Sequence, residues 1–88
     1  LAYKETEVVD YGPMFVDPTY RGNGLQYQML KELDKIAKQK GYKYAIVTVH
    51  PDNTYSIRNI EQDNFKLLAT KTFSRGKRNI YLKKYLDS

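Results

Sequence analysis

The first hydrophobic segment of the chain is extended and is broken by a glycine and a proline. Apolar residues run from Val8 to Val16, with Gly12 and Pro13 between them. Because proline cannot donate a ladder hydrogen bond, this pair predicts a bulge or an unpaired stretch within a strand. Pro18 then ends the strand, since the residue before a proline is pushed out of the helical region.

The next segment, from Leu25 to Ala37, has apolar residues at the spacing of an α-helix. The apolar positions with this spacing are Leu25, Met29, Leu30, Leu33, Ile36 and Ala37, and charged residues occupy the opposite face. Lys38 and Lys40 complement the helix dipole, and Gly41 supplies a left-handed stop. The pattern therefore predicts an amphipathic helix from Leu25 to about Lys40.

The remaining pattern predicts a strand, a short helix and a hairpin. The apolar run 42–49 suits a strand covered on both faces. Asn53 can cap a helix to about Gln62, with Ile57 and Ile60 on its inner side. The alternating residues Phe65, Leu67, Ala69 and Phe73 predict a strand, residues 74–77 a turn, and Ile80, Leu82 and Lys84 a return strand.

These elements indicate an α/β fold with a mixed sheet. The first strand-helix-strand unit should be parallel with a right-handed crossover, and the end should be an antiparallel hairpin. The 88 residues allow one small domain, and 41% hydrophobic with 28% charged residues suits a soluble globular one. No apolar run approaches the roughly 20 residues of a membrane span. A chain that begins with Leu1 rather than Met is expected to be a fragment.

Composition narrows the chemistry. Without cysteine there is no disulfide, thiolate metal site or cysteine nucleophile, which fits a cytoplasmic location. The net charge of +5 favours anionic partners, although many small domains are basic for solubility alone. No histidine or carboxylate spacing suggests a metal site.

A glycine-rich turn lies between the first strand and the long helix. Gly22 and Gly24 allow positive φ and close backbone approach, so that successive N–H groups can point at one anion. The helix start adds unsatisfied donors, and Arg21 adds a cation, so a phosphate group suits this turn. No Gly-Lys-Ser/Thr tripeptide occurs, and Tyr27 stands where a dinucleotide fingerprint needs a small residue. A tight turn without a ligand is the alternative.

The wider segment, Val16-x-Pro18-x-Tyr20-Arg21-Gly22-x-Gly24-Leu25, resembles motif A of the GNAT superfamily of acetyltransferases. The order of elements, Asn53-x-x-Ser56 and Phe65 agree with that superfamily from about Val8 onward. The resemblance implies an acyl-CoA N-acyltransferase-like fold, whose mostly antiparallel sheet has one parallel, splayed strand pair with helices packed on it. Residues 1–88 would form the C-terminal, acetyl-CoA-binding portion of a single domain whose N-terminal half is missing.

The resemblance also implies a binding site for acetyl-CoA as cosubstrate. Backbone groups of the bulged strand would contact the pantetheine arm, those of the turn would hold the pyrophosphate, and the start of the second helix would lie beside the cofactor. The residues in these roles would be Met14, Phe15 and Val16, then Arg21, Gly22, Asn23, Gly24, Leu25 and Gln26, and finally Asn53 and Ser56. Plain helix capping is an equally good interpretation of Asn53 and Ser56.

Three positions depart from the family pattern. Gln26 stands where glycine or alanine is usual, and Asn64 replaces the glycine before Phe65. Ile60 falls where many members carry a tyrosine that protonates the departing thiolate. The general acid and base are therefore open.

Several side chains are candidates for the acid or base. His50 could accept a proton, but an exposed loop histidine is the more ordinary interpretation. Tyr55 could donate one, although a packed aromatic residue is the simpler interpretation. Glu5, Glu7 and Asp10 are further candidates for the base.

Besides an acetyltransferase with an amine acceptor, the sequence suits other functions and partners. The basic, tyrosine-containing tail 71–85 also suits nucleic acid, but a solvated hairpin whose lysines prevent edge pairing is the better interpretation. A family member that binds the cofactor without catalysis is a further alternative. A missing half would leave a sheet edge open, which predicts a homodimer or aggregation.

Overall fold

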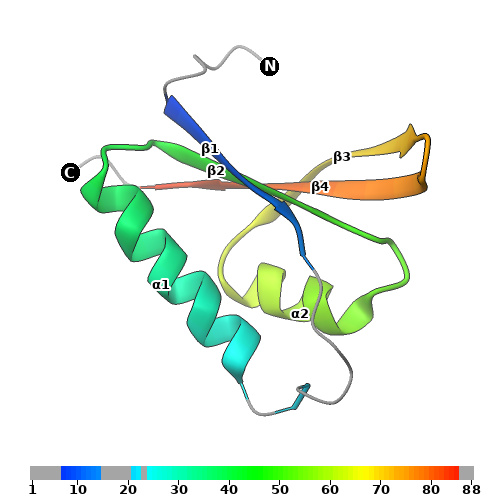
Figure 1. Cartoon of the computed structure of the whole chain (residues 1–88), viewed down its shortest axis with the longest axis horizontal. Helices are drawn as coiled ribbons and strands as arrows, with labels where there is room; N and C mark the ends of the chain where they lie inside the picture. Colours follow the sequence, from blue (N-terminus) through cyan, green and yellow to red (C-terminus); the bar gives the residue numbers. More distant parts are fainter. Residues whose placement is uncertain (1–6, 15–20, 23, 86–88) are drawn as a thin grey trace.

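The computed structural model describes residues 7–14, 21–22 and 24–85. The elements follow the predicted order (Figure 1). They are β1 (Val8–Pro13), α1 (Leu25–Gln39), β2 (Tyr44–Val49), α2 (Thr54–Gln62), β3 (Lys66–Phe73) and β4 (Gly76–Lys84).

The four strands form one mixed sheet in the order β1-β2-β4-β3. β1 is parallel to β2, and β4 runs antiparallel to both of its neighbours. Both helices lie on the same side of this sheet (Figure 1). The predicted parallel pair and the C-terminal hairpin are therefore confirmed.

The predicted bulge in the first strand is also confirmed. The register between β1 and β2 shifts between Asp10 and Pro13. Gly12 has a φ of +77° there, and its N–H donates to Asp10 Oδ1 at 2.7 Å. Pairing resumes at once, because the Met14 N–H donates to the Thr48 carbonyl at 2.8 Å. The bulge thus changes the register of β1 just before the chain enters the turn.

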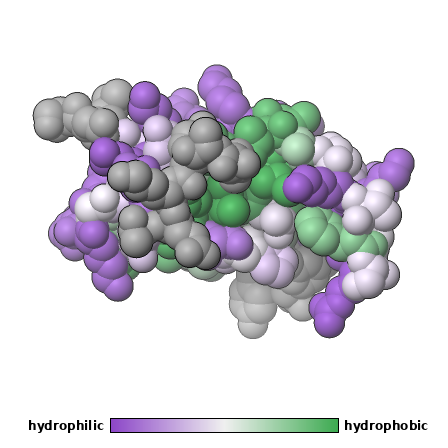
Figure 2. Space-filling view, turned by 90° about the horizontal axis from the view of Figure 1, so that it is seen from above, coloured by the Kyte–Doolittle hydropathy of each residue, from purple (hydrophilic) through white to green (hydrophobic). Residues whose placement is uncertain are grey.

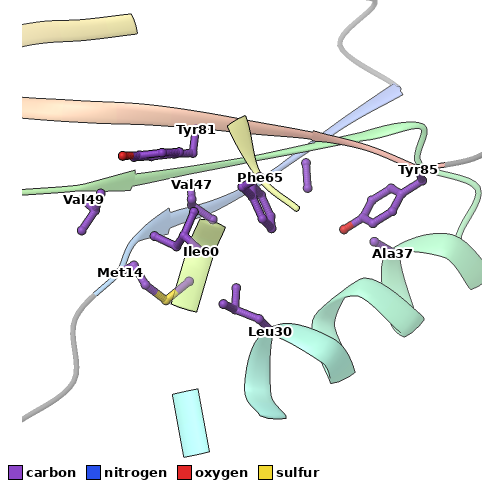
Figure 3. Close-up of a cluster of buried hydrophobic side chains, with 10 residues drawn as sticks. Met14, Leu30, Ala37, Val47, Val49, Ile60, Phe65, Tyr81 and Tyr85 are labelled. Atoms are coloured by element: carbon purple, nitrogen blue, oxygen red, sulfur yellow. The ribbon is translucent and has the colours of Figure 1, made fainter. Parts of the chain in front are cut away.

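The core fills the space between the sheet and the two helices (Figure 3). Its buried members are Met14, Leu30, Ala37, Ala45, Val47, Val49, Ile60, Phe65, Tyr81 and Tyr85. Along β2, burial alternates, with Ala45, Val47 and Val49 facing the core. The expectation that this strand is covered on both faces is wrong for the described residues, because both helices lie on one side.

The other face of the sheet is only partly covered. Thr48 and Ile46 alternate with the buried residues of β2, and they pair with Ile80 and Leu82 of β4. On β3, Leu67, Leu68 and Phe73 are exposed. Figure 2 shows apolar side chains gathered on the molecular surface seen from above the sheet. β3 is confirmed as a strand, but its apolar alternation does not correspond to burial.

The buried face of α1 differs from the apolar face that the sequence predicts. Its buried residues are Gln26, Leu30, Asp34 and Ala37. Leu25, Met29 and Ile36 are 43–50% exposed. The helix bounds agree with prediction, and Gly41 has the expected left-handed backbone with φ +85°. The buried face of α1 is offset from the predicted apolar face because the polar side chains of Gln26 and Asp34 point inward.

One of these polar side chains belongs to a buried ion cluster that joins α1, α2 and β4. Lys83 Nζ lies 2.8 Å from Asp34 Oδ2 and 3.1 Å from Asp63 Oδ1. Lys31 is half exposed at the surface, and its Nζ lies 2.9 Å from the same Asp63 oxygen. The prediction that the lysines of the tail are solvated is therefore wrong for Lys83, which faces inward between Tyr81 and Tyr85.

Two tyrosines extend the cluster to β1. Tyr85 Oη donates to Asp34 Oδ1 at 2.7 Å and lies 2.6 Å from Tyr11 Oη. Burial raises the pKa of Tyr11 to about 12 and raises the pKa of Tyr85 further. Burial, with Asp63 beside it, also raises the pKa of Asp34. Burial acts in the same direction on Asp63, but the contacts from Asp34, Lys31 and Lys83 outweigh it and lower the pKa of that carboxyl.

Candidate functional site

The turn before α1 has the backbone shape expected of an anion-binding loop. Gly22 and Gly24 have φ values of +88° and +78°. Gly24 is the N-cap of α1, so no side chain caps this helix from its own N-cap position, and its first turn carries no acidic residue. A helix start without a carboxylate leaves its positive end available to an external anion.

The start of α2 is capped by its own asparagine. Asn53 Oδ1 accepts a hydrogen bond from the Ser56 N–H at 3.2 Å, as predicted. The Asn53 N–H donates to the His50 carbonyl at 2.9 Å, which ties the cap to the end of β2. The side chain of Asn53 is thus positioned at the exit of β2 by two local hydrogen bonds.

Replacing this cap should lower stability in a graded way. Asn53→Ala should cost about 1 kcal/mol of unfolding free energy, whereas Asn53→Gly should cost only a few tenths. Urea unfolding followed by circular dichroism measures both values. Thr54→Ala, at the exposed first position of α2, is the control and should stay within about 0.5 kcal/mol of the original chain. Equal losses for Asn53→Ala and Thr54→Ala would contradict the capping role.

The turn and α2 touch each other directly. The Gly22 N–H donates to Tyr55 Oη at 3.0 Å, across 33 positions of sequence. The guanidinium carbon of Arg21 lies 5.3 Å from the centroid of the Tyr55 ring, within cation–π range. The hydroxyl of Tyr55 therefore occupies an acceptor position at the amide that was predicted to face a phosphate.

A buried amide joins the same two elements behind the turn. Gln26 Nε2 donates to Ser56 Oγ at 2.9 Å, and Gln26 Oε1 accepts from Asn59 Nδ2 at 2.7 Å. Gln26 and Ser56 are almost fully buried. Sequence reasoning placed Gln26 in the site only through its backbone and did not predict this contact. Hydrophobic periodicity alone gives no signal for it, because the residue is polar.

An open pocket of about 420 Å³ lies between the turn and the start of α2. Its lining residues are Arg21, His50, Asp52, Asn53, Thr54 and Tyr55. The side chain of His50 is half exposed, and its Nδ1 accepts a hydrogen bond from the Asp52 N–H at 3.1 Å. The pocket thus brings together four residues that the sequence selected: Arg21, Asn53 and the two acid-base candidates.

Other predicted site residues lie elsewhere or outside the described residues. Met14 is buried in the core, and Leu25 is half exposed at the start of α1. Ile60 is fully buried, so the position of the usual proton donor is part of the core. Phe15, Val16, Asn23 and Glu5 lie outside the described residues.

Comparison with known proteins decides the family. The family model described as the acetyltransferase (GNAT) family matches residues 2–65, which include β1, the glycine turn, both helices and β2. The chain belongs to the GNAT family. This match covers most of the chain and contains both the loop at α1 and the start of α2.

Solved structures agree with the GNAT fold. A GNAT family acetyltransferase from Elizabethkingia anophelis with acetyl-CoA bound superposes with a TM-score of 0.81 at 16% identity, covering 92% of this chain and 63% of that protein. An N-acetyltransferase from Staphylococcus aureus Mu50 gives 0.72 at 30% identity, covering 78% and 46%. The NatC complex bound to Gag peptide and CoA gives 0.77 at 14% identity, covering 88% and 50%.

These matches confirm the expected acyl-CoA N-acyltransferase-like fold of the GNAT chain. The chain spans less than two thirds of the length of each of these three proteins. No curated protein matches its sequence significantly. Neither helix in the described ranges has both the length and the apolar character needed to cross a membrane. Within the same ranges, histidines and carboxylates do not form a group of three or more suited to a metal ion.

Proposed function

We propose that this chain is the acetyl-CoA-binding, C-terminal portion of a single GNAT domain whose protein transfers an acetyl group from acetyl-CoA to a primary amine. The observation that carries the proposal is the start of α1, where Gly22 and Gly24 have positive φ within the GNAT match. Support also comes from two of the similar structures above, which hold acetyl-CoA or CoA.

Different residues of the chain would bind different parts of the cofactor. Backbone amides from Arg21 to Gln26, Asn23 included, would bind the pyrophosphate, helped by the positive end of α1. The guanidinium of Arg21 adds a charge at the rim of the 420 Å³ pocket. Asn53 and Ser56 would lie beside the pantetheine arm, where Asn53 already lines the pocket. The segment from Met14 through Phe15 and Val16 would supply backbone groups to the same arm.

The reaction forms a carbon–nitrogen bond and breaks the thioester carbon–sulfur bond. The amine must lose a proton and the departing thiolate must gain one. Ile60 cannot donate that proton, because its side chain is aliphatic and fully buried. His50 and Tyr55 line the pocket and stay candidates for proton transfer. Tyr55 Oη accepts from the Gly22 N–H and His50 Nδ1 accepts from the Asp52 N–H, so these contacts favour neither side chain over the other.

β1 is an edge of the four-stranded sheet among the described residues, so a homodimer formed through this edge stays a prediction. A cytoplasmic location is proposed from the absence of cysteine in the sequence. Nucleic acid is not proposed as a partner, although the net charge of +5 makes it a necessary control.

A thermal melt with acetyl-CoA tests the proposal. A ligand at about 100 times its Kd adds roughly 2.7 kcal/mol, and each kcal/mol moves Tm by about 4–8 °C in so small a domain. We expect a shift with acetyl-CoA that exceeds the shifts with equal concentrations of ATP and a short oligonucleotide. A shift with the oligonucleotide alone would support nucleic-acid binding instead. If acetyl-CoA shifts the Tm of this chain but the full-length protein acetylates no amine in a panel, the protein binds the cofactor without catalysis.

A further inference from the structure

We propose that Gln26 is a positioning residue: its side-chain amide fixes the phosphate-binding loop against the start of α2 and thereby sets the affinity for acetyl-CoA. This inference rests on the proposed function. The backbone N–H of Gln26 would bind the pyrophosphate, whereas its side chain would hold the loop in place.

Both ends of the Gln26 side-chain amide form hydrogen bonds. The nitrogen donates to Ser56 Oγ at 2.9 Å, and the oxygen accepts from Asn59 Nδ2 at 2.7 Å. Gln26 is only 1% exposed, so water does not compete for these groups. Hydrogen bonds between buried polar groups are costly to leave unmade, and a satisfied network specifies one arrangement of the elements that carry it.

Gln26 and Ser56 lie at the starts of their helices. Gln26 is in the first turn of α1, two positions after the N-cap Gly24. Ser56 is in the first turn of α2, and its N–H is bound by the side chain of Asn53. The amide therefore links the two helix starts at the point where each would meet the cofactor.

Among the described residues, the contacts of Gly22 and Arg21 with Tyr55 also join the turn to α2, and they lie at the surface. The bond from the Gly22 N–H to Tyr55 Oη is exposed, and the Arg21–Tyr55 pair is open to the pocket. Because water competes for exposed contacts of this kind, they hold the loop less firmly than a buried hydrogen bond does. Gln26 provides the buried link, so loss of its amide should let the loop move relative to Asn53 and Tyr55.

The test is a calorimetric titration of the chain with acetyl-CoA. Gln26→Met keeps the length of the side chain and removes both hydrogen bonds, and we expect it to raise Kd about tenfold. Gln28→Met makes the same change at an exposed position of α1 and should leave Kd unchanged. Ala37→Gly, near the other end of the helix, should lower stability while leaving Kd unchanged.

A double-variant cycle identifies the partner. If Gln26 acts through Ser56, then Gln26→Met combined with Ser56→Ala should weaken binding less than the sum of the two single effects. The inference is overturned if Gln26→Met binds like the original chain, or if Ala37→Gly weakens binding as much. If the original chain itself binds no acetyl-CoA, the proposed function fails and the inference fails with it. The two failures are distinguishable. A failure of the proposed function is seen with the original chain alone, whereas a failure of the inference alone is seen only with the variants.

Discussion

Replacing Lys83 by methionine should cost about 3–5 kcal/mol of unfolding free energy, because it leaves two buried carboxylates without their shared cation. Lys83 Nζ lies within 3.1 Å of both Asp34 and Asp63. Among the described residues, Asp63 Oδ2 has no hydrogen-bond partner, so the cluster is already short of donors. For a small domain with a urea m-value of about 1–3 kcal/mol per M, the midpoint should fall by roughly 1–5 M.

Urea unfolding of paired variants separates charge from packing. Lys84→Met removes the neighbouring, exposed lysine of β4 and should have little effect. Adding Asp34→Asn to Lys83→Met removes the charge of the carboxylate that has lost its cation and keeps an oxygen that can accept from Tyr85, so part of the lost stability should return. Equal midpoints for Lys83→Met and Lys84→Met would show that the ion cluster does not stabilise the fold.

Replacing Gly24 by valine should weaken acetyl-CoA binding by roughly 5- to 150-fold. Gly24 has a φ of +78° at the N-cap of α1, and, apart from its chain neighbours, a Cβ there would meet no atom of the described residues within 4 Å. The effect is therefore one of backbone conformation, since a β-branched residue at positive φ costs about 1–3 kcal/mol. Relief of that strain would turn the N–H groups of the loop away from a bound phosphate.

Gly41 provides a matched control for this prediction. It lies beyond the other end of α1 with a φ of +85°, and a Cβ there likewise meets nothing within 4 Å in the described part of the chain beyond its own neighbours. Gly41→Val should therefore cost similar stability but leave Kd for acetyl-CoA unchanged. Calorimetric titration of both variants below their melting temperatures measures this difference. Similar losses of affinity in both would show that the loop at Gly24 has no specific role in binding.

Most of the backbone could be predicted from the sequence because its signals are local. Pro13 and Gly12 predicted the bulge of β1, Gly41 the end of α1, and Asn53 the start of α2. Each of these signals acts through the conformation or hydrogen bonding of one short segment. Such effects do not depend on the rest of the fold.

The inward-facing polar residues could not be predicted in the same way. Gln26, Asp34 and Lys83 are buried because partners from distant segments satisfy them. Hydrophobic periodicity assigns such residues to the solvent, since burial of a lone polar group is unfavourable. The position of the loop beside α2 depends on these long-range contacts. For that reason, the sequence identified Gly24 and Asn53 separately but not the hydrogen bonds that join their helices.

The contact between Gly22 and Tyr55 has a consequence for the energetics of anion binding at the loop. The Gly22 N–H already donates to Tyr55 Oη, 3.0 Å away. An incoming anion would therefore exchange one hydrogen bond for another at this amide. Such an exchange contributes only the difference between the two bonds. In return, the tyrosine holds the amide in a defined direction before any ligand arrives, which reduces the entropy lost on binding. Tyr55 would thus occupy the hydrogen-bonding position of the anion at Gly22. It would lower the net gain from that contact and hold the amide in the orientation that binding requires.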